Sequence, residues 1–240
     1  MTISILQDGG DCRNLVVFLL CDGSKSMHGA KIGALNMAMD ELSARILEYA
    51  KDNPHLRILV QVVVFSGDGA TTAFQKWVSP QEFRWTPLTA NGGTPMGAAF
   101  DVARQELENL PKSATYLQPT IVLVSDGQPT DDWEVPLGRL HACPMGKDSQ
   151  MFAVAIGDAN RDILGKFCAG SEIGVLEASN ASKLVDHIVD KSIALADAAV
   201  TGRSFTTGSN PSQSIDLGDL PEGSINESFI DNSQYENDLF

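Results

Sequence analysis

Residues 15–26 read LVVFLLCDGSKS, and this stretch decides the fold class. Seven apolar residues run without interruption up to Asp22, which is typical of a strand buried on both faces of a parallel sheet. Ser24 and Ser26 then follow at every second position. One carboxylate and two hydroxyls at the end of a strand are hard oxygen ligands, which suit Mg²⁺ or Mn²⁺ better than softer metals. A Ser/Asp turn that caps the next helix is the plainer interpretation of the same residues.

Strand and helix patterns alternate along the rest of the chain, which predicts a doubly wound, mostly parallel α/β sheet flanked by helices. Residues 30–52 carry apolar side chains at helical spacing. Two strands, 58–65 and 73–78, follow with short connections and are expected to form a hairpin at one edge of the sheet. The other predicted elements are helices at 95–110, about 131–141, 161–168 and 181–199, and strands at 121–124, 151–156 and 173–176.

Two of these helices have predicted caps. Thr94 precedes Pro95, and Pro is well suited to the first turn of a helix, so Thr94 is expected to be the N-cap. Asp131 and Glu134 have the spacing of a capping box for the helix that ends near residue 141.

The composition predicts one α/β domain with a tail: a lead-in at 1–13, the domain at 14–200 and the tail at 201–240. No apolar stretch reaches the roughly 18–20 residues of a membrane span, and no basic segment precedes an apolar one at the N-terminus. We therefore expect a cytoplasmic protein. The net charge of −14 argues against nucleic acid and anionic membranes as partners.

The four cysteines are widely spaced, with no CxxC pair, and are expected to be reduced structural thiols. They are Cys12, Cys21, Cys143 and Cys168. A zinc site is not expected.

The tail carries seven acidic residues after Arg203 and no Lys or Arg. Few aliphatic and many Ser, Asn and Gly residues predict a solvated segment that cannot order itself. Interleaved apolar residues leave open a peptide that docks on a partner or back on the domain. A tail carboxylate at a metal site and phosphorylation by a partner kinase are two further hypotheses.

Two strands are followed by aspartates, Asp22 and Asp126, and a GGT loop places Thr94 between them in sequence. Ligands of open α/β sheets bind beyond the carboxyl ends of the strands, where the strand order reverses. If the two strands are neighbours there, both carboxylates converge and the Thr94 hydroxyl can approach from the side. The turn after the first strand lacks GxGxxG, and no GxxxxGK[ST] occurs, so a nucleotide site is disfavoured.

The segments DGSKS, NGGTPMG and VSDGQPTDDW resemble, in order and spacing, the three metal-binding loops of von Willebrand factor A (vWA) domains. The resemblance covers about residues 14–199 and implies a vWA, Rossmann-like fold. It also implies a metal-ion-dependent adhesion site (MIDAS) made by Asp22, Ser24, Ser26, Thr94 and Asp126, with Mg²⁺ or Mn²⁺ as the ion.

Three segments of the sequence are most similar to the TerY-like branch of that family: FLLCDGSKSMHGAKIGALN, TANGGTPMGAAF and VSDGQPTDDW. These are bacterial proteins of tellurite-resistance and stress-response gene clusters, some encoded beside a protein kinase and a PP2C-type phosphatase. The resemblance implies a Ser/Thr kinase and such a phosphatase as candidate partners. The extra cysteine-rich domain of some relatives is not found in this sequence.

The function implied is a non-catalytic module that binds a Glu or Asp of a partner protein through the metal. Asp22, the two serines and Thr94 would hold the ion directly or through one water, with Asp126 further out. Lys25 and His28 are either solvated loop residues or, with Gly93, part of the rim that meets an acidic partner.

A Mg²⁺- or Mn²⁺-dependent phosphoryl-transfer enzyme, or a regulatory subunit of a kinase/phosphatase system, is the alternative. Transfer would need an aimed base and a cation for the phosphate. The loops offer Asp131, Asp132 and Lys25, but capping and solvent exposure are simpler roles for them. We therefore expect no catalysis.

Overall fold

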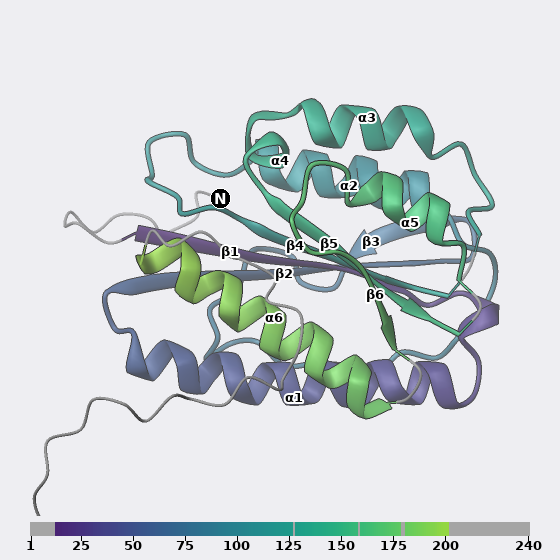
Figure 1. The fold of residues 1–240 in the computed structure, drawn as a ribbon, viewed down its shortest axis with the longest axis horizontal. Coiled ribbons are helices and arrows are strands. Elements are labelled where there is room, and N and C mark those ends of the chain that lie inside the picture. Colours follow the sequence, from purple (N-terminus) through teal and green to yellow (C-terminus); the bar gives the residue numbers. More distant parts are fainter. Residues whose placement is uncertain (1–12, 127, 158, 179–180, 202–240) are drawn as a thin grey trace, which may run out of the picture. The chain divides into compact units, whose positions relative to one another are not determined.

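The computed structural model describes residues 13–126, 128–157, 159–178 and 181–201 (Figure 1). The predicted acidic tail, Cys12 and all but the last residue of the predicted lead-in lie outside the described residues. The strands are β1 (Arg13–Asp22), β2 (Leu56–Ser66), β3 (Gly69–Thr72), β4 (Thr120–Ser125), β5 (Gln150–Ile156) and β6 (Gly174–Ala178). The helices are the one-turn 3₁₀ helix η2 (Lys25–Met27), α1 (Ala30–Asp52), α2 (Met96–Glu108), α3 (Glu134–Ala142), α4 (Pro144–Lys147), α5 (Arg161–Phe167) and α6 (Ala181–Thr201).

The strands form one sheet in the order β3-β2-β1-β4-β5-β6. Every pair is parallel except β2 and β3, which form an antiparallel hairpin at one edge. The predicted fold class is therefore confirmed. After β1 the chain adds β2 and β3 on one side of β1, and it then crosses to the other side of β1 to add β4, β5 and β6. The direction in which strands are added therefore reverses between β1 and β4. This is the position at which ligands of such sheets bind.

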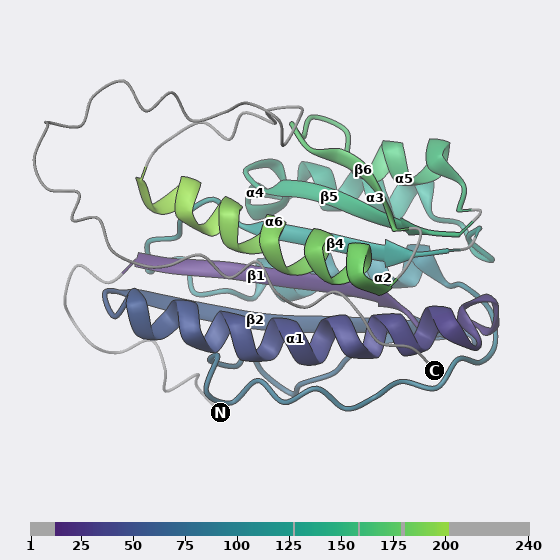
Figure 2. The same cartoon turned by 60° about the horizontal axis from the view of Figure 1, so that its bottom comes forward.

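The core explains why β1 is apolar without interruption from Leu15 to Cys21. Alternate side chains of a strand point to opposite faces. Leu15, Val17 and Leu19 pack in the layer that contains α1 and α6, while Val16 and Phe18 pack in the layer that contains α2, α3 and α5. Figures 1 and 2 show α1 and α6 on one face of the sheet and the other α-helices on the opposite face. Since both faces are covered, the seven consecutive positions from Leu15 to Cys21 are all buried and apolar.

The predicted strand at 73–78 is wrong. The edge strand is β3, at Gly69–Thr72, because Gly67 has a φ of +62° and allows a tight turn immediately after β2. Within the predicted segment, Val78 forms an isolated bridge opposite Val60, and Ala73 N–H donates to Val62 O. The apolar side chain of Val78 is buried in the core without a strand ladder. The short helix α4 was not expected from the sequence.

No helix in the described part of the chain combines the length and the apolar composition that crossing a membrane requires.

Candidate metal centre

Asp22 is the last residue of β1 and is completely buried. The backbone N–H of Ser24 donates to its Oδ1 at 2.8 Å, as in an Asx turn. The hydroxyl of Ser125 donates to its Oδ2 at 2.5 Å. Because Ser125 is the last residue of β4, this bond joins the carboxyl ends of the two central strands.

A second set of bonds carries the cluster outward to the surface. The Oγ atoms of Ser24 and Ser26 are 2.9 Å apart, and Ser26 Oγ donates to Asp126 Oδ1 at 2.7 Å. Ser24 and Asp126 are buried, whereas Ser26 is exposed. The η2 turn makes this possible, since Met27 N–H donates to Ser24 O and the buried Met27 side chain anchors the loop. Four of the five predicted side chains therefore meet at one end of the sheet, as the sequence predicted.

The loop that carries the fifth residue, Thr94, runs beside the first loop. Asn91 N–H donates to Gly23 O at 2.9 Å, and Lys25 N–H donates to Gly92 O at 3.0 Å. Thr94 itself is buried, with 4 % of its surface exposed. The structure thus brings all three predicted loops together, and the role of these side chains as metal ligands stays a prediction.

Sequence reasoning missed Lys31, in the first turn of α1. Its Nζ forms an ion pair with Asp126 Oδ2, and the Asp126 side chain is fully buried. The two oxygens of this carboxylate are therefore divided between a hydroxyl and an ammonium group. No sequence signal distinguishes Lys31 from an ordinary surface lysine, because the contact depends on how α1 is placed against the end of β4.

The donor set fits a hard divalent cation. The four predicted side chains that meet carry only oxygen as potential ligand atoms, and two of them are carboxylates. Burial raises the pKa of the Asp22 carboxyl above its ordinary value, and the Asp126 carboxylate raises it further, although hydrogen bonds from Ser125 and Ser24 oppose this. A buried carboxylate whose charge is unfavourable is a position where a bound cation would be stabilised.

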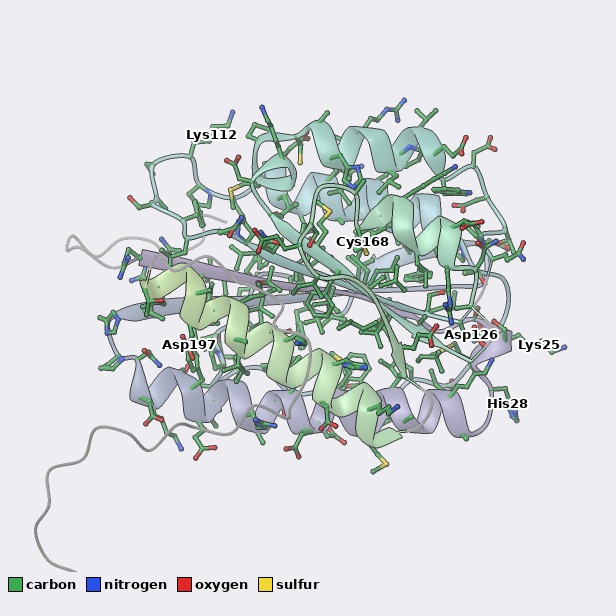
Figure 3. The ribbon with its side chains drawn as sticks, viewed as in Figure 1. Lys25, His28, Lys112, Asp126, Cys168 and Asp197 are labelled. Carbon is green, nitrogen blue, oxygen red and sulfur yellow. The ribbon has the colours of Figure 1, made fainter. Side chains whose placement is uncertain are left out.

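The predicted rim residues lie at the same end of the sheet. Figure 3 shows Lys25 and His28 projecting outward there, with Asp126 behind them. Both are exposed. Gly93 is half-buried, and a Cβ at this position would lie 2.9 Å from Thr130 Oγ1 and 3.1 Å from Gly67 O. Gly93 therefore permits close loop packing, and contact of these residues with a partner stays a prediction.

Both predicted caps are wrong. The N-cap position of α2 is Pro95, and Asp131 from the loop after β4 supplies the cap instead. Its Oδ1 accepts from Gly97 N–H at 3.0 Å and its Oδ2 from Ala98 N–H at 2.9 Å. Helix α3 begins after Trp133, with no side-chain cap bond. The Asp131 carboxylate lies at the N-terminus of α2, where the free N–H groups of the first helical turn attract a negative charge.

Thr130 continues this connection, which ties the loop that carries Thr94 to the loop after β4. Thr94 N–H donates to Thr130 Oγ1 at 3.0 Å, and Thr130 N–H donates to Thr94 O at 2.9 Å. Together with the Asp131 bonds, this pairing fixes the position of Thr94 relative to the end of β4. We call residues 130–131 and their partners 94–98 the loop clamp.

Replacing Asp131 with Ala should lower the free energy of unfolding by about 1–2 kcal/mol, because two helix N–H groups lose their acceptor. Urea denaturation monitored by circular dichroism measures this. The neighbouring Asp132 is exposed, so Asp132→Ala is the matched control and should change stability by less than about 0.5 kcal/mol. Equal losses in both variants would contradict the assignment of Asp131 as the cap.

The remaining candidate ligands stay apart. Among the described residues, no group of three or more His, Cys, Asp or Glu side chains is placed to hold a metal ion. Cys21, Cys143 and Cys168 are buried and free, as expected for reduced structural thiols. Burial raises the pKa of Cys168 to about 12, so this thiol stays protonated at neutral pH.

Comparisons with known proteins establish the fold. No family model and no curated protein matches the sequence. Among solved structures, the von Willebrand factor type A protein from Catenulispora acidiphila is 18% identical with a TM-score of 0.57, over 76% of this chain and 42% of that one. The vWF domain of the type V pili tip protein Mfa5 from Porphyromonas gingivalis is 10% identical with a TM-score of 0.58, over 80% of this chain and 97% of that one.

A third structure is proximal thread matrix protein 1 from the mussel byssus, with a zinc-occupied MIDAS motif. It is 20% identical with a TM-score of 0.54, over 77% of this chain and 47% of that one. This chain thus spans less than half of the first and third of these structures. Identities this low report on the backbone arrangement alone, and this arrangement agrees with the parallel sheet and flanking helices described above. The chain has the von Willebrand factor A fold.

Proposed function

We propose that this chain is a non-catalytic, metal-dependent protein-interaction module. Asp22, Ser24, Ser26, Thr94 and Asp126 would hold Mg²⁺ or Mn²⁺, and a Glu or Asp of a partner protein would complete the coordination of the ion. The observation that carries the proposal is the continuous series of hydrogen bonds that links buried Asp22 through Ser24 and Ser26 to Asp126. The zinc-occupied MIDAS motif of the mussel protein supports a divalent ion on this fold.

Buried and exposed residues of the site have different roles in this proposal. Asp22 and Ser24 form the buried floor of the site, and exposed Ser26 marks where a partner can approach. A bound divalent cation would supply a position that accepts a carboxylate oxygen, which a neutral side chain cannot match. Two serines in place of carboxylates keep the negative charge of the site low. Lys25 and His28 would then meet the acidic surface of the partner.

The assignment to a branch of the family rests on the amino-acid sequences of the three loops. We propose a TerY-like role in bacterial tellurite resistance or stress response, in the cytoplasm, with a Ser/Thr kinase and a PP2C-type phosphatase as candidate partners. The pilus proteins among the structural neighbours, such as Mfa5, support protein partners in general.

Phosphoryl transfer is less well supported by the geometry. Asp131, a candidate base, has both carboxylate oxygens engaged by the N-terminus of α2. Asp132 is an exposed loop residue, and Lys25 is an exposed residue of η2. Neither arrangement aims a base or a cation at a reacting group.

The test is metal-dependent capture. Immobilised full-length protein is exposed to lysate of the source cells with Mn²⁺, and captured protein is eluted with EDTA. We expect capture to need the metal, to be competed by excess acetate, and to be lost in Asp22→Asn. The same preparation is incubated with Mn²⁺ and a generic phosphate ester. Capture that is equal with EDTA and in the variant would contradict the proposal, and turnover that depends on Asp22 would establish the enzyme instead.

A further inference from the structure

We propose that Lys31 is an internal counter-charge that weakens binding of the free cation and makes metal binding depend on a partner's carboxylate. This inference rests on the proposed function, because it concerns the regulation of the same site. It begins from the ion pair between Lys31 Nζ and Asp126 Oδ2. The Asp126 side chain is fully buried, so water screens its charge poorly and the ammonium group of Lys31 interacts with it strongly.

The fold makes room for this lysine. Gly157 follows the last residue of β5 and has a φ of +64°. A Cβ at Gly157 would lie 3.2 Å from Lys31 Cε and 3.4 Å from its Nζ. The side chain therefore passes closely over a glycine at the end of one strand to reach the carboxylate at the end of the next. The Lys31 side chain packs against Gly157 and pairs with Asp126, and both contacts direct it toward the site. Its side chain is 36 % exposed.

Lys31 changes the net charge of the site that a bound cation would meet. Asp22 and Asp126 together would neutralise a divalent ion completely. With Lys31 beside Asp126, the two carboxylates and the ammonium carry one net negative charge, so a bound divalent ion leaves one positive charge in excess. A partner's Glu or Asp carries the single negative charge that removes this excess. Lys31 therefore opposes the metal alone and favours the metal together with a carboxylate.

Lys31 also restricts how Asp126 can act. One carboxylate oxygen accepts from Ser26 and the other contacts the ammonium group. Both oxygens are engaged by side chains of the chain itself. Asp126 is then better suited to orient Ser26 than to contact the ion, which agrees with the outer role expected for it. A neutral residue at position 31 would release Oδ2 and increase the negative charge available to the metal.

The experiment measures Mn²⁺ binding to the full-length chain by calorimetry, with chloride or with acetate at matched ionic strength. We expect Lys31→Met to bind Mn²⁺ about tenfold more tightly than the wild type in chloride, because a nearby positive charge is removed. Acetate should increase Mn²⁺ affinity in the wild type and have a smaller effect in Lys31→Met. Lys31→Arg keeps the charge and should resemble the wild type.

Two further variants complete the design. Lys112 lies at the opposite end of the domain from Lys25 and Asp126 in Figure 3, so Lys112→Met makes the same change in net charge away from the site and should leave Mn²⁺ affinity unchanged. Lys31→Gln repeats the neutralisation with a polar side chain, should Lys31→Met fold poorly. Equal or weaker Mn²⁺ binding in the neutral variants overturns the inference and leaves the proposed function standing. If neither the wild type nor the neutral variants bind Mn²⁺, the proposed function fails and the inference fails with it.

Discussion

Replacing Asp22 with Asn should abolish stabilisation of the domain by metal while leaving the metal-free protein at least as stable as the wild type. The carboxylate is buried, and burial raises its pKa, so its negative charge is unfavourable where it lies. Asn keeps nearly the same shape and one carbonyl acceptor for the Ser24 N–H, while the Ser125 hydroxyl can turn to accept from the new amide. Removing the charge therefore relieves a cost in the metal-free protein and removes a main source of metal affinity.

Thermal unfolding of the full-length chain with and without Mn²⁺ measures both effects. At an Mn²⁺ concentration of about 100 times Kd, the ion should stabilise the wild type by about 2.7 kcal/mol, or roughly 5–10 °C in Tm for a domain of this size. Asp22→Asn should show almost none of this rise. Asp68 is an exposed residue in the turn after β2, at the same end of the sheet, so Asp68→Asn is the matched control and should retain the rise. A full Mn²⁺ response in Asp22→Asn would show that the ion binds elsewhere.

The centre of the site was predictable because its geometry follows from strand direction. An apolar run that ends in Asp22 and a second that ends in Ser125 and Asp126 are both parallel strands, and parallel strands of one sheet end at the same edge. Only their adjacency had to be assumed, and the order β2-β1-β4 supplies it. Ser24 and Ser26 follow from the local turn, which is encoded within a few residues.

The parts that sequence reasoning missed depend on contacts between distant elements. Asp131 has the spacing of a cap for its own helix, yet it caps α2, because α2 presents its N-terminus to the loop after β4. Lys31 has the pattern of a surface lysine, and only the packing of α1 against the sheet brings it to Asp126. The edge strand Gly69–Thr72 has too little apolar content to be recognised, because its ladder with β2 is set by the turn at Gly67.

Replacing Gly97 with Ala should be among the most damaging single-methyl changes in this domain. A Cβ at Gly97 would lie 2.2 Å from Asp132 O, 2.9 Å from Asp132 C and 3.0 Å from Trp133 Cα. All three are backbone atoms, so no side chain can rotate to make room. Helix α2 and the loop after β4 would have to separate, which would break the Asp131 cap and move Thr94 away from the other two loops of the proposed metal site.

We expect Gly97→Ala to lower the free energy of unfolding by about 3–4 kcal/mol, from overpacking together with the lost cap. Gly138 in α3 is the matched control, since a Cβ there meets no atom within 4 Å. Gly138→Ala should be neutral or stabilise the protein by up to about 1 kcal/mol through helix propensity. Urea denaturation compares the stabilities of the two variants. If the Gly97→Ala variant is folded, calorimetry then measures whether its affinity for Mn²⁺ is reduced. A stable Gly97→Ala with normal Mn²⁺ binding would show that the loop clamp does not position the site, since the clamp cannot survive an added methyl group at this distance.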